Sequence, residues 1–325
     1  MAGAANGGKA GKLAMAEASM DSVQEAAQGR RRKVGLALGS GSARGWAHIG
    51  VLQELRSMGI QPDVVVGTSI GALVGAVYVS GQLDEFAQWV AGLGFRDVLG
   101  FLDIGFTGGM VKGEKLFSFF SEHQNNPHIE DLEVAFATVA TDMVLGREVW
   151  IREGEVLTAA RASSALPGLF PPVHHDGRWL LDGGLVNPVP VSACRALGAD
   201  VVIAVNLNGQ LVGRHFNPAD TEGIPTHTEE GESVWAKMKE YFGIDAEGQH
   251  EARPGLFDVM GASINIMQDR ITRSRMAGDP ADINLIPMLS DYAIMDFHRA
   301  EEAIAEGRRL VRNAEESIRW FIDCS

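Results

Sequence analysis

The stretch that decides the fold is Val64-Val65-Val66-Gly67-Thr68-Ser69-Ile70-Gly71. A run of three valines is typical of a buried strand, and the apolar segment 72–79 predicts a helix that ends near Gly81. Between the two lies the pattern Gly-x-Ser-x-Gly, whose glycines, Gly67 and Gly71, leave room for a sharp turn. Such a turn holds Ser69 in a strained conformation, with its hydroxyl at the start of a helix.

The same arrangement of strand, turn and helix occurs earlier in the chain. The segment 34–38 predicts a buried strand, and it leads into the glycine loop Gly39-Ser40-Gly41-Ser42-Ala43-Arg44-Gly45, after which apolar residues at helical spacing continue to Gly59. Strands that alternate with helices predict an α/β fold, in which helices cover both faces of a mixed, mostly parallel sheet in three layers. Further strands are predicted at 134–142, 148–151, 179–181, 201–206 and 283–286.

Composition indicates a globular protein and excludes some partners. The 325 residues are 46% hydrophobic and carry a net charge of −14. A chain this acidic repels phosphate backbones, so no nucleic-acid partner is expected. The longest apolar run, 64–79, is shorter than the roughly 20 residues that span a bilayer. Two cysteines, Cys194 and Cys324, do not suggest a disulfide framework and fit a cytoplasmic location. The sequence does not indicate the oligomeric state.

Three regions are expected along the chain. Residues 1–32 are rich in Ala, Gly, Ser and Glu and predict a disordered tail. Residues 33–325 predict one domain, with a polar insertion at about 208–254. Trp235, Met238 and Phe242 fall on one face of a short helix there, so a surface insertion and a flap that touches lipid both stay open. The closing segment, 297–322, is amphipathic and is expected to pack against the sheet.

The glycine loop has three interpretations. Gly39-x-Gly41 after a strand suggests a dinucleotide fingerprint, but Arg44 stands where the third glycine should be, and no acidic residue closes a second strand about 20 residues on. A purely structural tight turn is the second interpretation. We favour the third, in which successive amides converge on a developing oxyanion and Arg44 fixes the loop or adds positive charge. The candidate oxyanion residues are Gly39, Gly41, Ser42, Ala43, Arg44 and Gly45.

A serine nucleophile needs a base, and two kinds of base are available. His48, His174 and His175 are histidine candidates. The segment Asp182-Gly183-Gly184 follows the predicted strand 179–181, and paired glycines after an aspartate let the backbone approach closely. Asp182 is therefore placed to accept the proton directly, and an Asx-turn cap is the alternative. No grouping of residues has metal-ligand spacing, so neither a metal nor a cofactor is expected.

The glycine loop, the Gly-x-Ser-x-Gly turn and the Asp-Gly-Gly segment, in this order, resemble the patatin-like phospholipase family. The resemblance is strongest to the bacterial, cytoplasmic branch, which is similar to the catalytic domain of neuropathy target esterase. It runs from about Lys33 to Asn206, more loosely to 283–287, and includes the block 162–167 and Phe170-Pro171. It implies a Ser-Asp dyad with Ser69 as nucleophile and Asp182 as base, and an oxyanion hole in the glycine loop. Asp142 is similar to a position often acidic in this branch, and at most a supporting role is expected for it.

The resemblance implies a carboxylic ester hydrolase that cleaves lipid or small ester substrates through an acyl-enzyme. An acyltransferase or thioesterase with the same residues, or a catalytically inactive regulatory member, is the alternative. Peripheral contact with the inner face of a membrane is compatible with this activity. The acidic body disfavours anionic bilayers, which indicates either monomeric, micellar or zwitterionic substrates or the basic cluster 30–33 as the only electrostatic contact.

Overall fold

The computed structural model describes residues 31–94, 97, 126–167, 169–211 and 256–323. Most of the predicted tail and of the predicted insertion lies outside the described residues, as do Trp235, Met238 and Phe242. The limits of these two regions therefore stay predictions. Of the basic cluster, Arg31 pairs with Asp63, and Arg32 donates to the carbonyl oxygen of Phe321 at 2.9 Å. Both arginines thus have partners inside the protein.

The described residues form an eight-stranded sheet, with strands β1 (Val34–Leu38), β2 (Val64–Thr68), β3 (Ala135–Asp142), β4 (Glu148–Ile151), β5 (Val173–His175), β6 (Arg178–Asp182), β7 (Val201–Val205) and β8 (Ile283–Leu285). The strand order is β5-β6-β3-β2-β1-β7-β8, and β4 also pairs with β3. Strands β3, β2, β1, β7 and β8 pair in parallel, whereas β4, β5 and β6 pair antiparallel. The prediction of a mixed, mostly parallel sheet is confirmed, although the sequence did not indicate β5.

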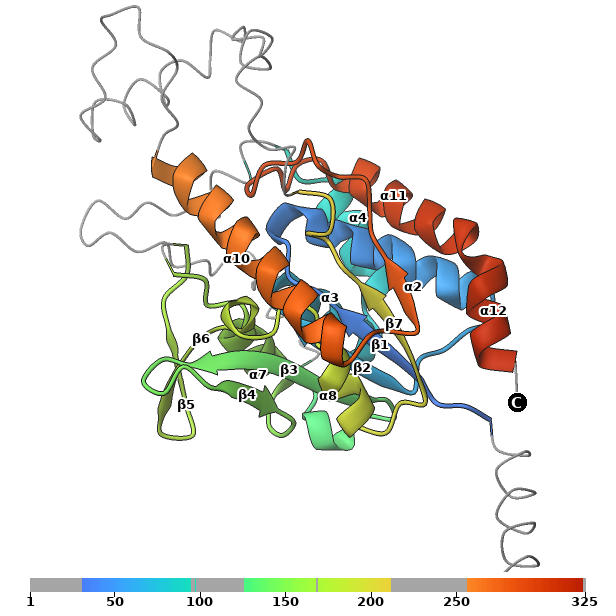
Figure 1. Cartoon of the computed structure of the whole chain (residues 1–325), viewed down its shortest axis with the longest axis horizontal. Helices are drawn as coiled ribbons and strands as arrows, with labels where there is room; N and C mark the ends of the chain where they lie inside the picture. Colours follow the sequence, from blue (N-terminus) through green and yellow to red (C-terminus); the bar gives the residue numbers. More distant parts are fainter. Residues whose placement is uncertain (1–30, 95–96, 98–125, 168, 212–255, 324–325) are drawn as a thin grey trace, which may run out of the picture.

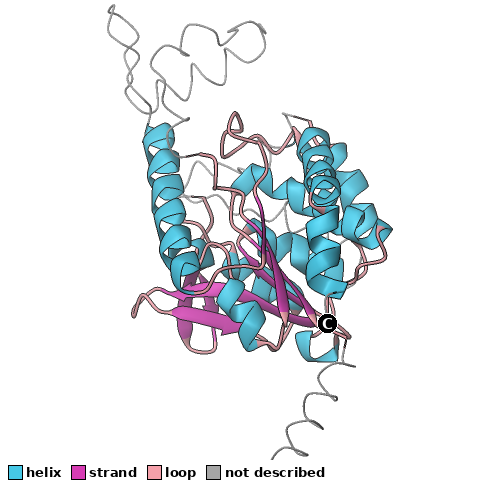
Figure 2. Cartoon of the chain, turned by 45° about the vertical axis from the view of Figure 1, so that its right-hand side comes forward, coloured by secondary structure: helices cyan, strands magenta, loops and turns pink. Residues whose placement is uncertain are grey.

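Helices cover both faces of this sheet (Figures 1 and 2). Side chains that alternate along β1 separate the two layers, because Leu36 and Leu38 belong to one buried cluster and Ala37 to the other. The larger cluster includes residues of α2 (Ala47–Ser57), α3 (Ile70–Val79), α4 (Leu83–Ala91), α7 (Val156–Ser163) and α11 (Ala300–Asn313). The smaller includes residues of α8 (Val191–Ala196), and Met276 near the end of α10 (Leu256–Gly278) packs against it. The three-layer α/β architecture is therefore confirmed.

The closing amphipathic segment packs onto the core, but through α2. A β-carbon added at Gly50 of α2 would lie 1.9 Å from the carbonyl oxygen of Ile304. One added at Gly307 of α11 would lie 2.0 Å from that of Ala47, so the two helices touch backbone to backbone. The segment is also not one helix, because α11 ends at Asn313 and α12 (Glu315–Asp323) begins after Ala314.

Candidate active site

Strands β2 and β6 approach each other end to end along one edge of β3. Val139 of β3 pairs with Thr68, the last residue of β2, and the next residue, Ala140, pairs with Asp182, the last residue of β6. Strand β4 pairs with both Val139 and Ala140 and so occupies the opposite edge. Because Ser69 directly follows Thr68, the sheet register brings Ser69 and Asp182 together.

The turn that carries Ser69 is strained. Ser69 has φ 56° and ψ −124°, a combination that residues other than glycine rarely adopt. A β-carbon at Gly67 would lie 2.4 Å from the Cα of Ala72, and one at Gly71 would lie 2.2 Å from the carbonyl oxygen of Leu38. Both glycines are therefore required for the turn to fit between β2, β1 and α3.

The Ser69 hydroxyl is joined directly to the Asp182 carboxylate. Ser69 Oγ donates to Asp182 Oδ2 at 2.5 Å, and the amide of Gly184 donates to Asp182 Oδ1 at 2.7 Å. Thr141 Oγ1 donates to the main-chain oxygen of Asp182 at 2.7 Å and fixes its backbone. Burial of Asp182 raises the pKa of its carboxyl to about 6, and the two hydrogen bonds to the carboxylate offset only part of this rise. The carboxylate is therefore a stronger base than an exposed aspartate.

Ser163, at the end of α7, supports the turn from behind. The amide of Ser69 donates to Ser163 Oγ at 2.9 Å, and Ser163 Oγ donates to the carbonyl oxygen of Val139 at 2.5 Å. The amide of Ser69 is thus engaged and has no free hydrogen to donate. The sequence placed Ser163 only in a block that resembles the family, because nothing local in the sequence shows that this hydroxyl reaches the Ser69 turn.

The amides of the glycine loop divide into engaged and free groups. Gly39 donates to the carbonyl oxygen of Val205 at 3.1 Å, and Ala43 donates to that of Ile294 at 3.3 Å. In contrast, the amides of Gly41 and Ser42 have no hydrogen-bond acceptor among the described residues. Ser42 is the first residue of the 3-10 helix Ser42–Trp46 and Gly41 precedes it, so neither amide has an acceptor inside that helix.

Arg44 and Gly45 shape the loop from inside the protein. Arg44 is 1% exposed, its Nε donates to the carbonyl oxygen of Gly41 at 3.1 Å, and its terminal nitrogen donates to Asn265 Oδ1 of α10 at 3.0 Å. Burial lowers the pKa of this guanidinium to about 10, so it stays charged at neutral pH. A β-carbon on Gly45 would lie 2.1 Å from the Ile70 side chain, so this glycine permits the loop to pack on α3.

Helix α10 presents a polar buried face to the same region. Asn208, after β7, donates through Nδ2 to Gln268 Oε1 at 2.7 Å, and Gln268 Nε2 lies so close to Gly184 that an added β-carbon would meet it at 2.4 Å. Arg275 Nε donates to the carbonyl oxygen of Val186, just after the Asp-Gly-Gly turn, at 2.8 Å. Together with the Arg44 contact, α10 therefore holds both the glycine loop and the Asp-Gly-Gly turn.

The three histidines considered as a base for Ser69 do not contact its hydroxyl. His48 is buried in α2, where its Nε2 bonds to the carbonyl oxygen of Gly39 at 2.8 Å, and burial lowers its pKa to about 4. His174 and His175 are on β5, where His174 pairs with Trp179, three residues before Asp182 in β6. Three residues of a strand span roughly 10 Å. Among the described residues, no histidine shares a hydrogen bond with Ser69.

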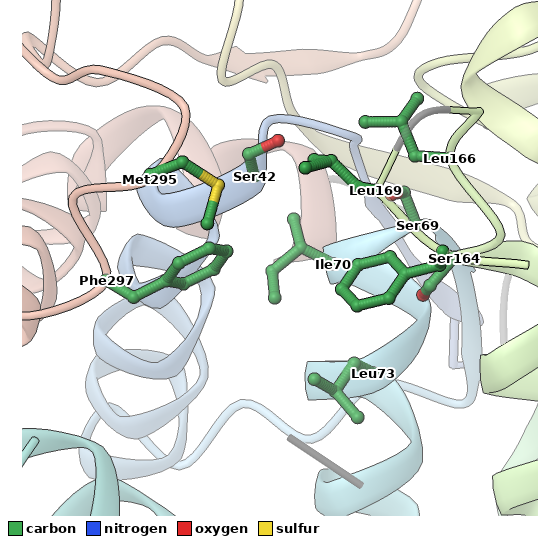
Figure 3. A pocket seen from close by; sticks show the side chains of 10 residues that line it. Ser42, Ser69, Ile70, Leu73, Ser164, Leu166, Leu169, Met295 and Phe297 are labelled. Atoms are coloured by element: carbon green, nitrogen blue, oxygen red, sulfur yellow. The ribbon is translucent and has the colours of Figure 1, made fainter. Parts of the chain in front are cut away.

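Ser69 opens onto a pocket with apolar walls (Figure 3). The lining residues are Ser42, Ser69, Ile70, Leu73, Ser164, Leu166, Leu169, Phe170, Met295 and Phe297. Three serines supply the hydroxyl groups, and Ser164 Oγ is buried without a hydrogen-bond partner among the described residues. The pocket therefore presents apolar walls and three hydroxyl groups, one of them that of Ser69.

The described part of the chain holds neither a cluster of metal ligands nor a helix that could span a membrane. No group of three or more His, Cys, Asp or Glu side chains there could hold a metal ion. No described helix is both long enough and apolar enough to cross a bilayer. Asp142 lies apart from Ser69 and Asp182, at the β3–β4 turn, where its Oδ1 accepts the amides of Val144 and Leu145 at 2.9 Å each.

A three-layer α/β fold with a strained serine between a parallel strand and a helix defines a class of hydrolases that carry a nucleophile elbow. Comparison with known proteins narrows this class. A family model described as patatin-like phospholipase matches residues 36–195. NTE family proteins named as uncharacterized, from Mycobacterium bovis and Mycobacterium tuberculosis, are 36% identical to the chain over 331 residues, which covers 88% of this chain and 92% of theirs. The chain belongs to the patatin-like phospholipase family, which confirms the resemblance and the prediction of a carboxylic ester hydrolase.

Longer fungal proteins are also similar. Lysophospholipase NTE1 of Pyricularia oryzae is 29% identical over 286 residues, and the match covers 85% of this chain but 18% of the fungal protein. Lysophospholipase nte1 of Emericella nidulans is 36% identical over 185 residues, which is 54% of this chain and 12% of that protein. The crystal structure of VipD from Legionella pneumophila aligns with a TM-score of 0.41 at 13% identity, covering 91% of this chain and 77% of VipD, a likeness too weak to support an argument.

Proposed function

We propose that the chain hydrolyses the carboxylic ester of a lysophospholipid in two steps, with Ser69 as nucleophile and Asp182 as base. The observation that carries the proposal is the 2.5 Å hydrogen bond from Ser69 Oγ to Asp182 Oδ2, made by a serine in a strained turn. A nucleophile and a base within hydrogen-bond reach are the geometric requirement for covalent catalysis. A carboxylate that accepts the proton itself needs no intervening imidazole.

In the first step, Asp182 takes the proton of the Ser69 hydroxyl while Oγ bonds to the ester carbonyl carbon. The carbonyl oxygen becomes an oxyanion, which the amides of Gly41, Ser42 and Ile70 are available to stabilise. When the bond to the leaving alcohol breaks, Asp182 returns its proton to that alcohol. In the second step Asp182 takes a proton from water, the hydroxide displaces the acyl group from Ser69, and the serine recovers its proton.

Burial explains how the Asp182 carboxylate can act as the base without an imidazole. The raised pKa of Asp182, about 6, strengthens it as a base while leaving it ionised at neutral pH. Oxyanion donors supply the rest of the transition-state stabilisation, because each such donor typically stabilises the transition state by about 3 kcal/mol. Three available amides and the positive end of α3 are therefore enough to account for a large rate enhancement without a third catalytic side chain.

The substrate class rests on the pocket and on the fungal relatives. The apolar walls around Ser69 suit one acyl chain, and the fungal relatives are named lysophospholipases. A net charge of −14 favours a zwitterionic head group over an anionic one. We place the reaction in the cytoplasm, in line with the buried, unpaired Cys194.

The proposal is tested on the unmodified chain. After incubation with a fluorophosphonate, peptide mass spectrometry should find the adduct on Ser69, and lysophosphatidylcholine should yield free fatty acid and glycerophosphocholine. An adduct on another residue, or none, would contradict the proposal. If the acyl group instead appears on an added alcohol or thiol in preference to water, the chain is an acyltransferase.

The rate should depend on pH through Asp182. Because the carboxylate must be ionised to accept the proton, we expect log kcat/KM to be level above pH 6 and to fall with a slope of one below it. The raised pKa therefore removes activity as the pH falls through about 6, well above the pKa of an exposed aspartate. This pH profile is obtained from initial rates with a soluble nitrophenyl ester, measured about every half pH unit between pH 4.5 and 8. A profile that stays level down to pH 4.5 would exclude Asp182 as the base.

A further inference from the structure

The turn between β3 and β4 exposes three consecutive large apolar side chains. Met143 is 56% exposed, Val144 81% and Leu145 60%. The turn is held rigidly, because Asp142 Oδ1 accepts two of its amides and the amide of Gly146 donates to the main-chain oxygen of Asp142 at 2.8 Å. Turns normally carry polar residues, so a fixed turn that presents apolar side chains to water indicates a surface that becomes covered.

A tryptophan on the neighbouring hairpin extends this surface. Trp179 of β6 is 49% exposed, and the amide of Met143 donates to its carbonyl oxygen at 2.9 Å. Its ring meets that of His174 edge to face, with centroids 5.1 Å apart. We call Met143, Val144, Leu145 and Trp179 the apolar rim. In Figure 1 the ends of the hairpins that carry it lie at the left, away from α2, α4 and α11.

The apolar rim lies at the same end of the sheet as Ser69. Val139 of β3 is level with Thr68, and β3 continues in the same direction to Asp142. Three further residues of a strand add roughly 10 Å, so the turn projects beyond the level of Ser69. A surface that the apolar rim contacts would therefore lie on the side to which the carboxyl ends of β2 and β3 point.

The charges around the apolar rim decide what kind of surface fits it. The amides of Leu145 and Val144 lower the pKa of the Asp142 carboxyl most, and the charges of the exposed Arg178 and Arg147 nearby lower it further. Asp176, at the tip of the β5–β6 turn, is 86% exposed and balances part of this positive charge. The whole chain has a net charge of −14, which is repelled by an anionic surface. Arginines and a tryptophan beside apolar side chains suit a layer in which phosphates lie above hydrocarbon.

We propose that the apolar rim inserts into the surface of a zwitterionic phospholipid bilayer and so holds the mouth of the Ser69 pocket near lipid. The choice of lipid as the partner rests on the proposed function, whereas the exposed surface itself does not. Insertion removes the four side chains from water, so the binding is driven by apolar burial and changes little with salt.

The test is flotation of the full chain with phosphatidylcholine vesicles, comparing the wild type with a Val144→Ser, Leu145→Ser double variant. The matched control is Met288→Ser, because Met288 is 58% exposed and follows β8, at the opposite edge of the sheet. Val144 and Leu145 contribute apolar area worth at least a factor of about ten in partitioning. We expect the double variant to bind at least about tenfold more weakly, and the control and 0.5 M salt to change binding less than about twofold.

Hydrolysis of a soluble nitrophenyl ester separates this proposal from the proposed function. The double variant should keep wild-type activity on that ester, so loss of vesicle binding alone supports the insertion of the apolar rim. Equal binding of all three proteins would overturn it, as would binding that requires anionic lipid. If the wild type is a dimer in light scattering and the double variant is a monomer, a second copy covers the apolar rim and the lipid proposal is wrong.

Discussion

The single variants Ser69→Ala and Asp182→Asn, and the variant that combines these two substitutions, should all hydrolyse ester at the same residual rate. This rate should be at least about 1,000-fold below that of the wild type. The two side chains act as one unit, because the proton that Ser69 gives up is the one that Asp182 accepts across 2.5 Å. Removing either partner leaves only the oxyanion donors and the pocket, so the second substitution has nothing further to remove. Single-turnover hydrolysis of a nitrophenyl ester measures all three rates.

The stability of Asp182→Asn shows whether its loss of activity reflects misfolding. The pKa of Asp182 is about 6 in the folded chain and near its ordinary value of 3.8 in the unfolded chain. Below the unfolded pKa, Asp182 is protonated in both the folded and the unfolded chain. Above the folded pKa it is ionised in both, and the buried charge reduces the free energy of unfolding by about 3 kcal/mol. We therefore expect urea unfolding to show the wild type losing stability, relative to Asp182→Asn, as the pH rises from 4 to 7.

A histidine base would give the opposite pattern. Asp182→Asn would then keep most of its rate, whereas His174→Ala and His175→Ala would lose theirs. The position of His174 beside Trp179 makes this outcome unexpected, because the strand register separates it from Asp182 by three residues.

The parts of the fold that the sequence predicted are those with strong local patterns. The valine run of β2 and the apolar run of β1 are each buried throughout and followed by a glycine-rich turn, which is the clearest signal that a parallel strand gives. Strand β5 was missed because it has three residues, none of them buried, so it has no apolar pattern to detect. Strands β1 and β4 have the predicted limits, and those of the other predicted strands differ by one or two residues, where pairing rather than composition decides the end.

Helix α10 shows why contacts within the site were harder to predict. Its buried positions include Asn265, Gln268 and Thr272, whereas Ile266 and Met267 are about half exposed. The usual rule that apolar residues mark the buried face therefore fails, and hydrophobic periodicity would orient the helix wrongly. The polar face is buried because it meets Arg44, Asn208 and the Asp-Gly-Gly turn, which come from distant parts of the sequence.

The glycine loop shows the same limit at the level of single amides. Its glycines indicated donors that converge on a charge, but a sequence cannot tell which amides the protein already uses. Gly39 and Ala43 donate to main-chain oxygens of Val205 and Ile294, residues that lie far along the chain. Only the tertiary structure leaves Gly41 and Ser42 as the amides still available, and Ser163 as the hydroxyl behind the turn.

Gly71→Ala should abolish activity and lower the free energy of unfolding by at least about 3 kcal/mol, whereas Gly75→Ala on the same helix should do neither. A β-carbon at Gly71 would lie 2.2 Å from the carbonyl oxygen of Leu38 and 2.8 Å from that of Gly39, both of them backbone atoms. Backbone cannot move aside as a side chain can, so α3 must shift away from β1. That shift separates the amide of Ile70 from the glycine loop.

Gly75 is the matched control because its surroundings can adjust. The atoms nearest to an added β-carbon there are side-chain carbons of Phe136, Leu38 and Val65, at 3.2 to 3.4 Å. Alanine also favours a helix over glycine by up to about 1 kcal/mol, which offsets the tighter packing. Urea unfolding and ester hydrolysis measured on both variants test the difference. If Gly71→Ala and Gly75→Ala lose equal stability and activity, both glycines act only through helix packing. The close approach of α3 to β1 would then not be what holds the Ser69 turn.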